Sequence, residues 1–186
     1  LGTVSLVNES SPASVRVTPV GSSIAQIVAG GNSTCALLDD GSVSCWGSNW
    51  QGILGDGTTT STWSSSSNVI LPTGRTAISI DMHYQSACAI LDDNSLYCWG
   101  SNNVGQLGQT ATGNSYDSAG GRISTLPVEI DLGQGVASVA VGYNHTCAIT
   151  LAEELFCWGR NNWGQIGIGN FSYSEPSNNG LVDLGP

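Results

Sequence analysis

The chain has 186 residues, of which 40% are hydrophobic and only 10% are charged. It contains no lysine, and its four arginines are outnumbered by 14 acidic residues, which gives a formal net charge of −10. This charge repels a phosphate backbone and argues against a nucleic-acid partner. No run approaches the roughly 20 apolar residues that membrane insertion needs.

The first 20 residues predict strands that precede the main pattern of the chain. The chain opens at Leu1 without an initiator methionine and without the charged and apolar regions of a secretory signal, so we expect a mature product or a fragment. Two strand-like stretches follow, TVSLV and SVRVTPV. We expect residues 1–20 to complete a sheet in a neighbouring protomer.

Three similar segments then follow one another along the chain. They are CALLDDGSVSCWGSNWQGILG from Cys35, CAILDDNSLYCWGSNNVGQLG from Cys88 and CAITLAEELFCWGRNNWGQIG from Cys147. Each is preceded by an apolar strand (IAQIVAG, AISIDMH or VASVAVG), and each is followed by a variable polar stretch and a short apolar closing segment. The pattern predicts three repeats, with the boundaries 21–74, 75–134 and 135–186.

Each repeat contains a predicted β-hairpin. Gly41 and Asn94 supply the left-handed conformation that a short hairpin loop requires, and LAEEL takes the turn position in the third repeat. Counting outward from each turn places two cysteines opposite each other, which predicts three disulfides. The pairs are Cys35 with Cys45, Cys88 with Cys98, and Cys147 with Cys157. The alternative is a zinc site, whose cysteines usually come as closer pairs.

The predicted fold is all-β, with three propeller-blade-like antiparallel sheets and one hairpin disulfide in each. Repeats of this length are typical of β-propeller blades or similar stacked sheets, and no segment shows sustained helical periodicity. A partial propeller and an open superhelix both fit the sequence. Disulfides predict an oxidising compartment, so we expect an extracellular or cell-surface protein.

The segments GSNNVGQLG and GRNNWGQIG, each following CW, resemble the regulator-of-chromosome-condensation repeat. The resemblance runs from about Ser22 to the C-terminus and departs from the family pattern at Ile53, where glutamine is usual. It implies a propeller fold, which in its best-known members is a ring of about seven blades. The TCALLDDGSVSCWG form is similar to a secreted branch of the family, in particular to algal mastigoneme-like proteins of hair-like flagellar filaments.

Four Asn-x-Ser/Thr sequons are candidates for N-glycosylation in a secreted chain. Asn8 and Asn170 lie in terminal or variable stretches and are favoured. Asn32 and Asn144 occupy equivalent places three residues before a bridging cysteine. At these two positions the alternative is an unglycosylated turn of the repeat.

No catalytic, metal or cofactor site is predicted. His83 and His145 have no nucleophile placed beside them by spacing. The acidic pairs Asp39–Asp40 and Asp92–Asp93 sit at hairpin turns, where aspartate is favoured for its geometry. We therefore expect a protein that is not an enzyme.

Six tryptophans divide into two groups. Trp46, Trp99 and Trp158 follow a bridging cysteine and are predicted to pack in the core or between repeats, whereas Trp50 and Trp163 lie in the glycine-rich loop. Trp63, in the serine-rich stretch, is the predicted interface anchor. The sequence thus predicts an extracellular structural glycoprotein that self-associates head to tail in a filament. The alternative is a secreted recognition module that binds a protein or carbohydrate through its polar loops.

Overall fold

The computed structural model describes residues 23–108, 115–116, 122–171 and 181–184. In these ranges the chain forms β-strands joined by turns and loops, and no helix there is long and apolar enough to cross a membrane. Residues 1–20, where two extra strands were expected, lie outside the described residues, as does Asn8. The all-β prediction is confirmed.

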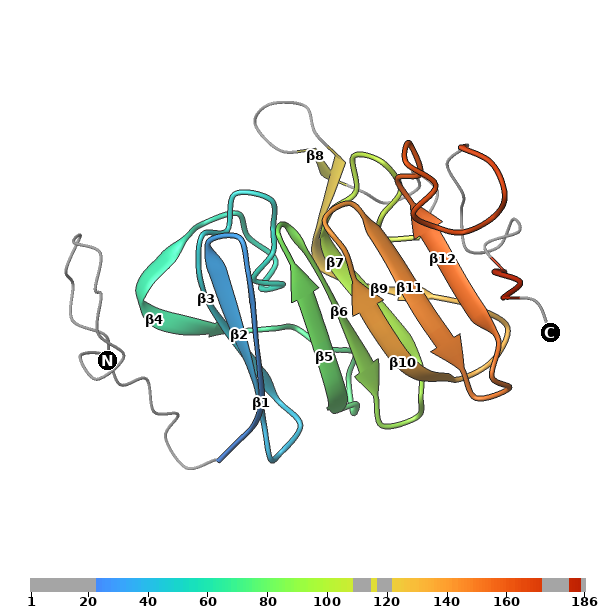
Figure 1. Cartoon of the computed structure of the whole chain (residues 1–186). Helices are drawn as coiled ribbons and strands as arrows, with labels where there is room; N and C mark the ends of the chain where they lie inside the picture. The colour runs from blue at the N-terminus through green and yellow to red at the C-terminus, as the bar shows by residue number, and fades with distance from the viewer. Residues whose placement is uncertain (1–22, 109–114, 117–121, 172–180, 185–186) are drawn as a thin grey trace, which may run out of the picture.

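The described strands form three antiparallel sheets, which Figure 1 shows side by side in chain order. Blade 1 is built from β1 (Ile24–Gly30), β2 (Ser33–Leu38), β3 (Val43–Gly47) and β4 (Thr62–Asn68). Blade 2 is built from β5 (Ala77–His83), β6 (Ser86–Leu91), β7 (Leu96–Ser101), β9 (Arg122–Ile130) and β8 (Ser115–Tyr116). Blade 3 is built from β10 (Val136–Val141), β11 (His145–Thr150) and β12 (Leu155–Gly159).

The central hairpin of each blade has the predicted register. Cys35 pairs with Cys45 across β2 and β3, and the equivalent cysteines pair in the other two blades. All three pairs are disulfide-bonded, with Cα atoms 4.1, 4.0 and 4.1 Å apart. The turns adopt the expected left-handed conformation at Gly41 (φ 77°), Asn94 (φ 64°) and Glu153 (φ 64°), so LAEEL is a hairpin turn.

The blades pack through their first strands as well as through their faces. β1 contacts β5, and β5 contacts β10. The Gln26 side chain bonds both backbone groups of Ile80, donating to the carbonyl at 2.7 Å and accepting from the N–H at 3.0 Å. Asp81 accepts a hydrogen bond of 2.6 Å from the backbone N–H of Val141. Side-chain polar groups therefore hold neighbouring first strands in register.

Two apolar cores lie between the blades. The first joins the disulfide-bearing face of blade 1 to the opposite face of blade 2, and the second joins blade 2 to blade 3 in the same way. Trp99 and Trp158 are fully buried in these cores. Their indole Nε1 atoms donate hydrogen bonds to the preceding blade, Trp99 to the Ile53 carbonyl at 2.8 Å and Trp158 to the Gln106 carbonyl at 3.1 Å. The predicted inter-blade packing of these two tryptophans is therefore observed.

Candidate functional site

The turns and loops of the three blades divide between two ends of the molecule. The turns that follow the first strands and the long loops that follow the third strands lie at one end, called here the loop end (Figure 1). The disulfide-hairpin turns lie at the opposite, hairpin-tip end. Because the blades share one direction, equivalent residues of different repeats meet at the same end.

A buried asparagine shapes the long loop of each blade. Asn49, Asn102 and Asn161 are each 3% exposed or less. Their side-chain Oδ1 atoms accept backbone hydrogen bonds from Leu54 (2.9 Å), Leu107 (3.0 Å) and Ile166 (3.2 Å). A buried amide bonded in this way is costly to displace, so each loop presents its intervening residues from a fixed backbone.

Four aromatic side chains lie exposed at the loop end and are called here the aromatic row. Its members are Trp50, Tyr84, Tyr143 and Trp163. All four are exposed, with Trp163 at 84% and Trp50 at 54% of their full surface. The rings of Tyr84 and Tyr143 stack with centroids 4.3 Å apart, which joins blade 2 to blade 3. Trp50 and Tyr84 border one hollow, and Tyr143 and Trp163 border another, so the row extends across all three blades.

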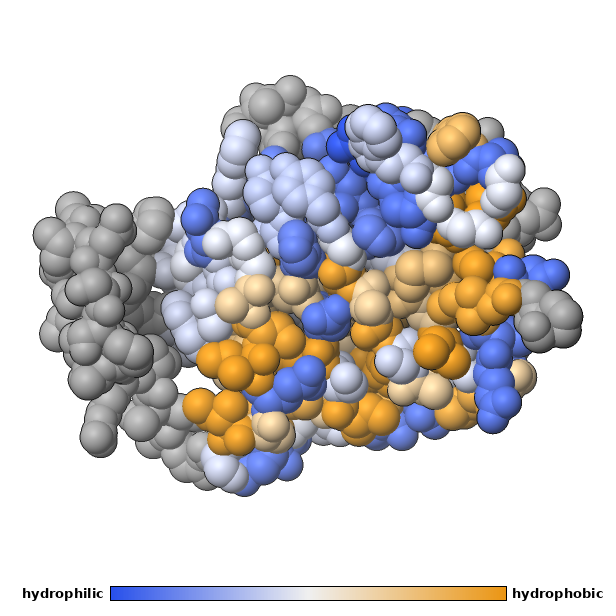
Figure 2. Space-filling view, viewed as in Figure 1, coloured by the Kyte–Doolittle hydropathy of each residue, from blue (hydrophilic) through white to orange (hydrophobic). Residues whose placement is uncertain are grey.

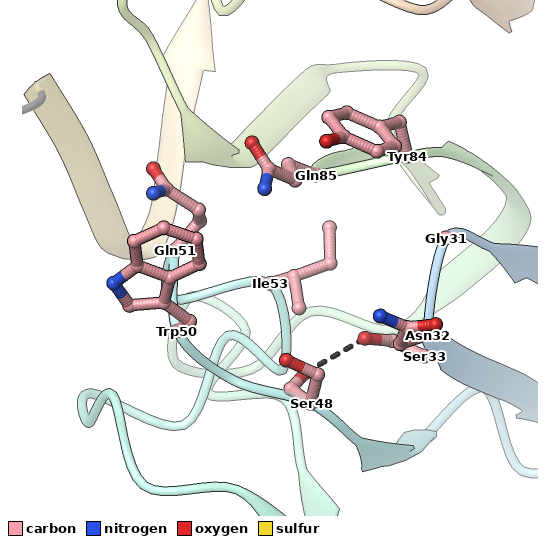
Figure 3. Close-up of a pocket in the computed structure, with 9 residues that line it drawn as sticks. All are labelled: Gly31, Asn32, Ser33, Ser48, Trp50, Gln51, Ile53, Tyr84 and Gln85. Atoms are coloured by element: carbon pink, nitrogen blue, oxygen red, sulfur yellow. Dashed lines mark hydrogen bonds between the residues drawn. The ribbon is translucent and has the colours of Figure 1, made fainter.

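The first hollow lies between blades 1 and 2 (Figure 3). Trp50 and Gln51 stand on one side of it, Tyr84 and Gln85 on another, and the buried side chain of Ile53 lies between them. The hollow is completed by Gly31, Asn32, Ser33 and Ser48, and the Ser33 hydroxyl donates to the Ser48 carbonyl at 2.7 Å. An apolar floor with amide groups at the rim suits a partner that has both apolar and hydrogen-bonding groups.

The second hollow uses the equivalent positions of blade 3. It is lined by Tyr143, Asn144, His145, Arg160, Trp163 and Gln165. Gln165 stands where blade 1 has Ile53, so the departure from the family pattern at Ile53 makes the first hollow more apolar than the second. Arg160 adds a positive charge that the first hollow lacks.

The ionisable groups in the row and beside it, Tyr143 and His145, have defined environments. Burial, with a smaller contribution from nearby His83, lowers the pKa of His145 below its usual value. A hydrogen bond with Tyr84, followed by burial, raises the pKa of Tyr143. At neutral pH both effects favour the uncharged forms of His145 and Tyr143, which suits an aromatic contact surface.

Negative charge gathers at the hairpin-tip end. The acidic residues found there are Asp39, Asp40, Asp92, Asp93, Glu129, Asp131, Glu153 and Glu154. Hydrogen bonds from Ser23 lower the pKa of Asp39, and hydrogen bonds from Ser95 lower that of Asp93. Arg75 forms ion pairs with Asp92 at 3.7 Å and with Asp93 at 2.6 Å. Both acidic pairs thus serve as turn residues, and Asp92 and Asp93 are also ion-pair partners.

The predicted glycosylation sites have different surroundings. Asn32 and Asn170 are exposed, and Asn144 is half-buried with its side-chain oxygen 3.4 Å from the Gln106 amide nitrogen. Asn32 and Asn144 each border one of the two hollows. Whether any of these asparagines carries a glycan stays a prediction.

The backbone of Trp63, the predicted interface anchor, lies in β4, and its side chain lies outside what the structure describes. Its role stays a prediction. Sequence reasoning noted Trp50 and Trp163 in the glycine-rich loop but did not single out Tyr84 or Tyr143. The available signal was the position of both tyrosines in the short link between the first two strands of a repeat.

The cysteines, histidines and acidic residues that sequence analysis considered for chemistry have these surroundings in the structure. All six cysteines are in disulfides. Within the described ranges no group of three or more His, Cys, Asp and Glu side chains is placed to hold a metal ion. His83 lies beside Tyr143, with ring centroids 6.2 Å apart.

Models of the regulator of chromosome condensation (RCC1) repeat match residues 93–149, 24–52 and 136–165, which together make up more than half of the chain. The Regulator of chromosome condensation of Drosophila melanogaster is 31% identical over 163 residues, covering 85% of this chain and 28% of that protein. The Ultraviolet-B receptor UVR8 of Arabidopsis thaliana is 37% identical over 86 residues, covering 46% of this chain and 18% of that protein. The chain thus spans less than a third of the length of either relative.

Solved propellers share the fold at lower sequence identity. Prp20p of Saccharomyces cerevisiae, whose structure was described with its binding properties to Gsp1p and histones, superimposes with a TM-score of 0.74 at 21% identity. That superposition covers 86% of this chain and 38% of Prp20p. Yeast RCC1 (Prp20) bound to Kap60 superimposes with a TM-score of 0.72 at 22% identity, covering 82% of this chain and 36% of that one. These likenesses establish the propeller-type fold of the blades.

Proposed function

We propose that this chain, which is built from regulator of chromosome condensation (RCC1) repeats, is a recognition module that binds a protein partner through its aromatic row. The observation that carries the proposal is the exposure of Trp50, Tyr84, Tyr143 and Trp163 along the loop end of three blades, where the two tyrosines stack and each borders a hollow together with one tryptophan. Tryptophan and tyrosine supply large contact areas at little cost in side-chain entropy, and they dominate the binding energy of protein interfaces.

Two further features support a protein partner over a small molecule. The hollows are rimmed by amides, serines and one arginine, a composition that resembles the adaptable polar contacts of a paratope. Among the similar structures, Prp20p is described with its binding to Gsp1p and histones, and yeast RCC1 is bound to Kap60. Since this chain covers 36–38% of those proteins, we carry over only the class of partner, a protein.

Panning a random peptide library on the immobilised, non-reduced chain tests the proposal. We expect the selected peptides to lose about tenfold or more in affinity for Trp163→Ala, since an aromatic anchor of an interface contributes at least about 1.4–2 kcal/mol. Leu184→Ala is the control, because Leu184 is exposed and lies outside the row. Equal affinity of the peptides for wild type and Trp163→Ala would contradict the proposal.

A glycan array run in parallel separates the two partner classes. Binding of a carbohydrate that Trp163→Ala abolishes, with no peptide selected, would replace the protein partner with a sugar. Such a result would keep the aromatic row as the site and change its ligand.

A structural role in an extracellular filament is the second candidate function. The observation that favours it is the exposure of apolar side chains on both end faces of the three-blade array, among them Ile27 and Ile149. Electron microscopy of the non-reduced chain tests this role: regular filaments would support it, and discrete particles at high concentration would overturn it.

We further propose an extracellular or cell-surface location with glycans at one or more of Asn8, Asn32, Asn144 and Asn170. Three disulfides are consistent with an oxidising compartment. Peptide mass spectrometry of chain secreted from a eukaryotic host, before and after glycosidase treatment, identifies the sequons in use. A glycan on Asn32 would stand beside the first hollow and restrict access to it.

A further inference from the structure

We infer that the first hollow is a pocket for a carboxamide side chain, asparagine or glutamine, of the protein partner. This inference rests on the proposed recognition role and deepens it, because it assigns the chemical class of residue that one part of the aromatic row admits. The hollow lies at the junction of blades 1 and 2, and both of its sides belong to described parts of this chain. The equivalent junction of blades 2 and 3 shows how such a hollow is filled.

The junction of blades 2 and 3 is closed by the amide of Gln106, which is 1% exposed. Its Nε2 atom donates to the Ser101 hydroxyl at 3.1 Å and to the Asn144 side-chain oxygen at 3.4 Å. Its Oε1 atom accepts a hydrogen bond of 3.0 Å from the backbone N–H of Val104. One buried carboxamide therefore joins its own loop to the first turn of the next blade.

The junction of blades 1 and 2 lacks this carboxamide. Blade 1 has Ile53 at the position of Gln106. The polar groups beside it are kept, since Ser48 and Gln85 occupy the positions that a serine and an asparagine take in the other junction. Figure 3 shows the Ile53 side chain between these two residues. An isoleucine side chain has no donor or acceptor, so residue 53 cannot form the bonds that Gln106 forms.

Two more departures of blade 1 from the repeat occur at the same hollow. Blades 2 and 3 both have tyrosine where blade 1 has Gly31, and both have asparagine where blade 1 has Trp50. Gly31 and Trp50 line the hollow together with Ile53. The glycine leaves its side of the hollow without a side chain, and the exposed indole of Trp50 adds a flat apolar wall. Three departures from two separate loops thus meet at one site.

The hollow has the size for one side chain. It holds about 150 Å³, a space comparable with cavities that accommodate a benzene ring. The methylene groups of a partner glutamine lie on Ile53 and beside Trp50, and its amide reaches the Ser48 hydroxyl and the Gln85 amide. Both of these groups donate and accept hydrogen bonds, as a carboxamide requires. Figure 2 shows a largely hydrophilic loop end, so the partner reaches this pocket across a polar surface.

The lining of the hollow favours a neutral amide over other side chains. Among the described residues that line it, none is acidic, basic or a histidine. A carboxylate or ammonium group buried there would lose its hydration without gaining an opposite charge. A wholly apolar side chain would cover the hydroxyl and the amide without bonding them. A carboxamide avoids both costs.

Two amide probes test the inference by nuclear magnetic resonance on the non-reduced 186-residue chain. N-acetylglutamine N-methylamide should shift the signals of the Trp50 indole N–H and the Gln85 side-chain amide and saturate at a roughly millimolar concentration. The leucine analogue carries the same backbone amides and should bind about tenfold more weakly, since it lacks the side-chain hydrogen bonds. Ile53→Gln should also bind the glutamine probe about tenfold more weakly, because its own amide fills the site as Gln106 does.

Ile78→Gln is the matched control, because it makes the same exchange at an exposed isoleucine of β5 outside the hollow. This variant should bind the glutamine probe like wild type. Circular dichroism and the melting temperature show whether Ile53→Gln is folded, and the two probes on wild type decide the question without it. Equal affinity of wild type for both probes would overturn the inference, as would equal affinity of folded Ile53→Gln and wild type for the glutamine probe.

The peptides selected for the recognition role separate the two possible failures. Peptides that need Trp163 should carry an asparagine or glutamine whose replacement by alanine costs about tenfold on wild type and nothing further on Ile53→Gln. Peptides that need Trp163 and lack this coupling would overturn the carboxamide pocket and leave the recognition role intact. Selection of no peptide would contradict the recognition role, and the probe titration would still decide whether the hollow binds a carboxamide.

Discussion

Two glycines of blade 1 determine where Tyr84 stands in the aromatic row. A Cβ atom on Gly30 would lie 2.8 Å from the Tyr84 nitrogen, and one on Gly31 would lie 2.6 Å from the Tyr84 carbonyl oxygen. Tyr84 itself has a positive φ of 52°, an uncommon conformation for a side chain of this size. The close approach of two turns therefore helps to hold the stacked pair of Tyr84 and Tyr143 in place.

Gly31→Ala should destabilise the chain by about 2–4 kcal/mol, combining the cost of a left-handed alanine with that of overpacking against Tyr84. Gly74→Ala is the control, because Gly74 has a φ of 79° and nothing within 4 Å of its Cβ position. The control should lose only about 1–2 kcal/mol. Urea unfolding measures both values, and equal losses would show that the approach to Tyr84 adds no constraint.

At the scale of the elements, the blade junction is the unit that the repeat specifies. The hairpins were predictable because turn type and strand register are local, and each cysteine pair is separated by only ten positions. The apolar closing segments also pair with the third strand of their blade. The backbone N–H of Val69 donates to the carbonyl of Val43, the first residue of β3, and the N–H of Val182 donates to the carbonyl of Leu155, the first residue of β12. The pairing of each tryptophan with a carbonyl of the preceding blade was beyond sequence reasoning, because it joins residues of separate repeats.

Trp99→Phe should lower the free energy of unfolding by about 2–3 kcal/mol. The substitution removes the 2.8 Å hydrogen bond to the Ile53 carbonyl and leaves that buried oxygen without its indole donor. Trp46→Phe, at the half-buried equivalent position of blade 1, should lose less than about 1 kcal/mol at a concentration where the chain is a monomer. Denaturant titration of both variants measures the two losses in the free energy of unfolding. A larger loss for Trp46→Phe than for Trp99→Phe would contradict the role of the Trp99 indole in joining blade 2 to blade 1.

At the scale of the whole molecule, the disulfides contribute much of the stability, and the acidic residues gather at one end. Each disulfide closes a short hairpin and stabilises the fold by roughly 2–3 kcal/mol, so the three together approach the total stability of an ordinary domain. The acidic hairpin-tip end lies opposite the aromatic row. Negative charge is therefore kept away from the surface proposed to bind.

Reduction of all three disulfides should lower the melting temperature by roughly 15–30 °C, from the summed loss of stability and the usual scaling for a chain of this size. Circular dichroism in the presence and absence of a phosphine reductant measures the change. Reoxidised protein serves as the control and should regain the original transition. A fall of only a few degrees would show that blade packing alone holds the fold.

The sequence by itself determined the all-β class, the three repeats, the hairpin registers and the disulfide pairing. Those features depend on turn chemistry and on pairings within about ten residues, which a repeated pattern displays directly. Only the tertiary structure decided that Trp50, Tyr84, Tyr143 and Trp163 all lie exposed at the loop end and that Ile27 and Ile149 lie exposed on opposite end faces. Both results depend on how separate blades pack against one another, because residues more than 20 positions apart meet only when the faces of whole sheets are paired.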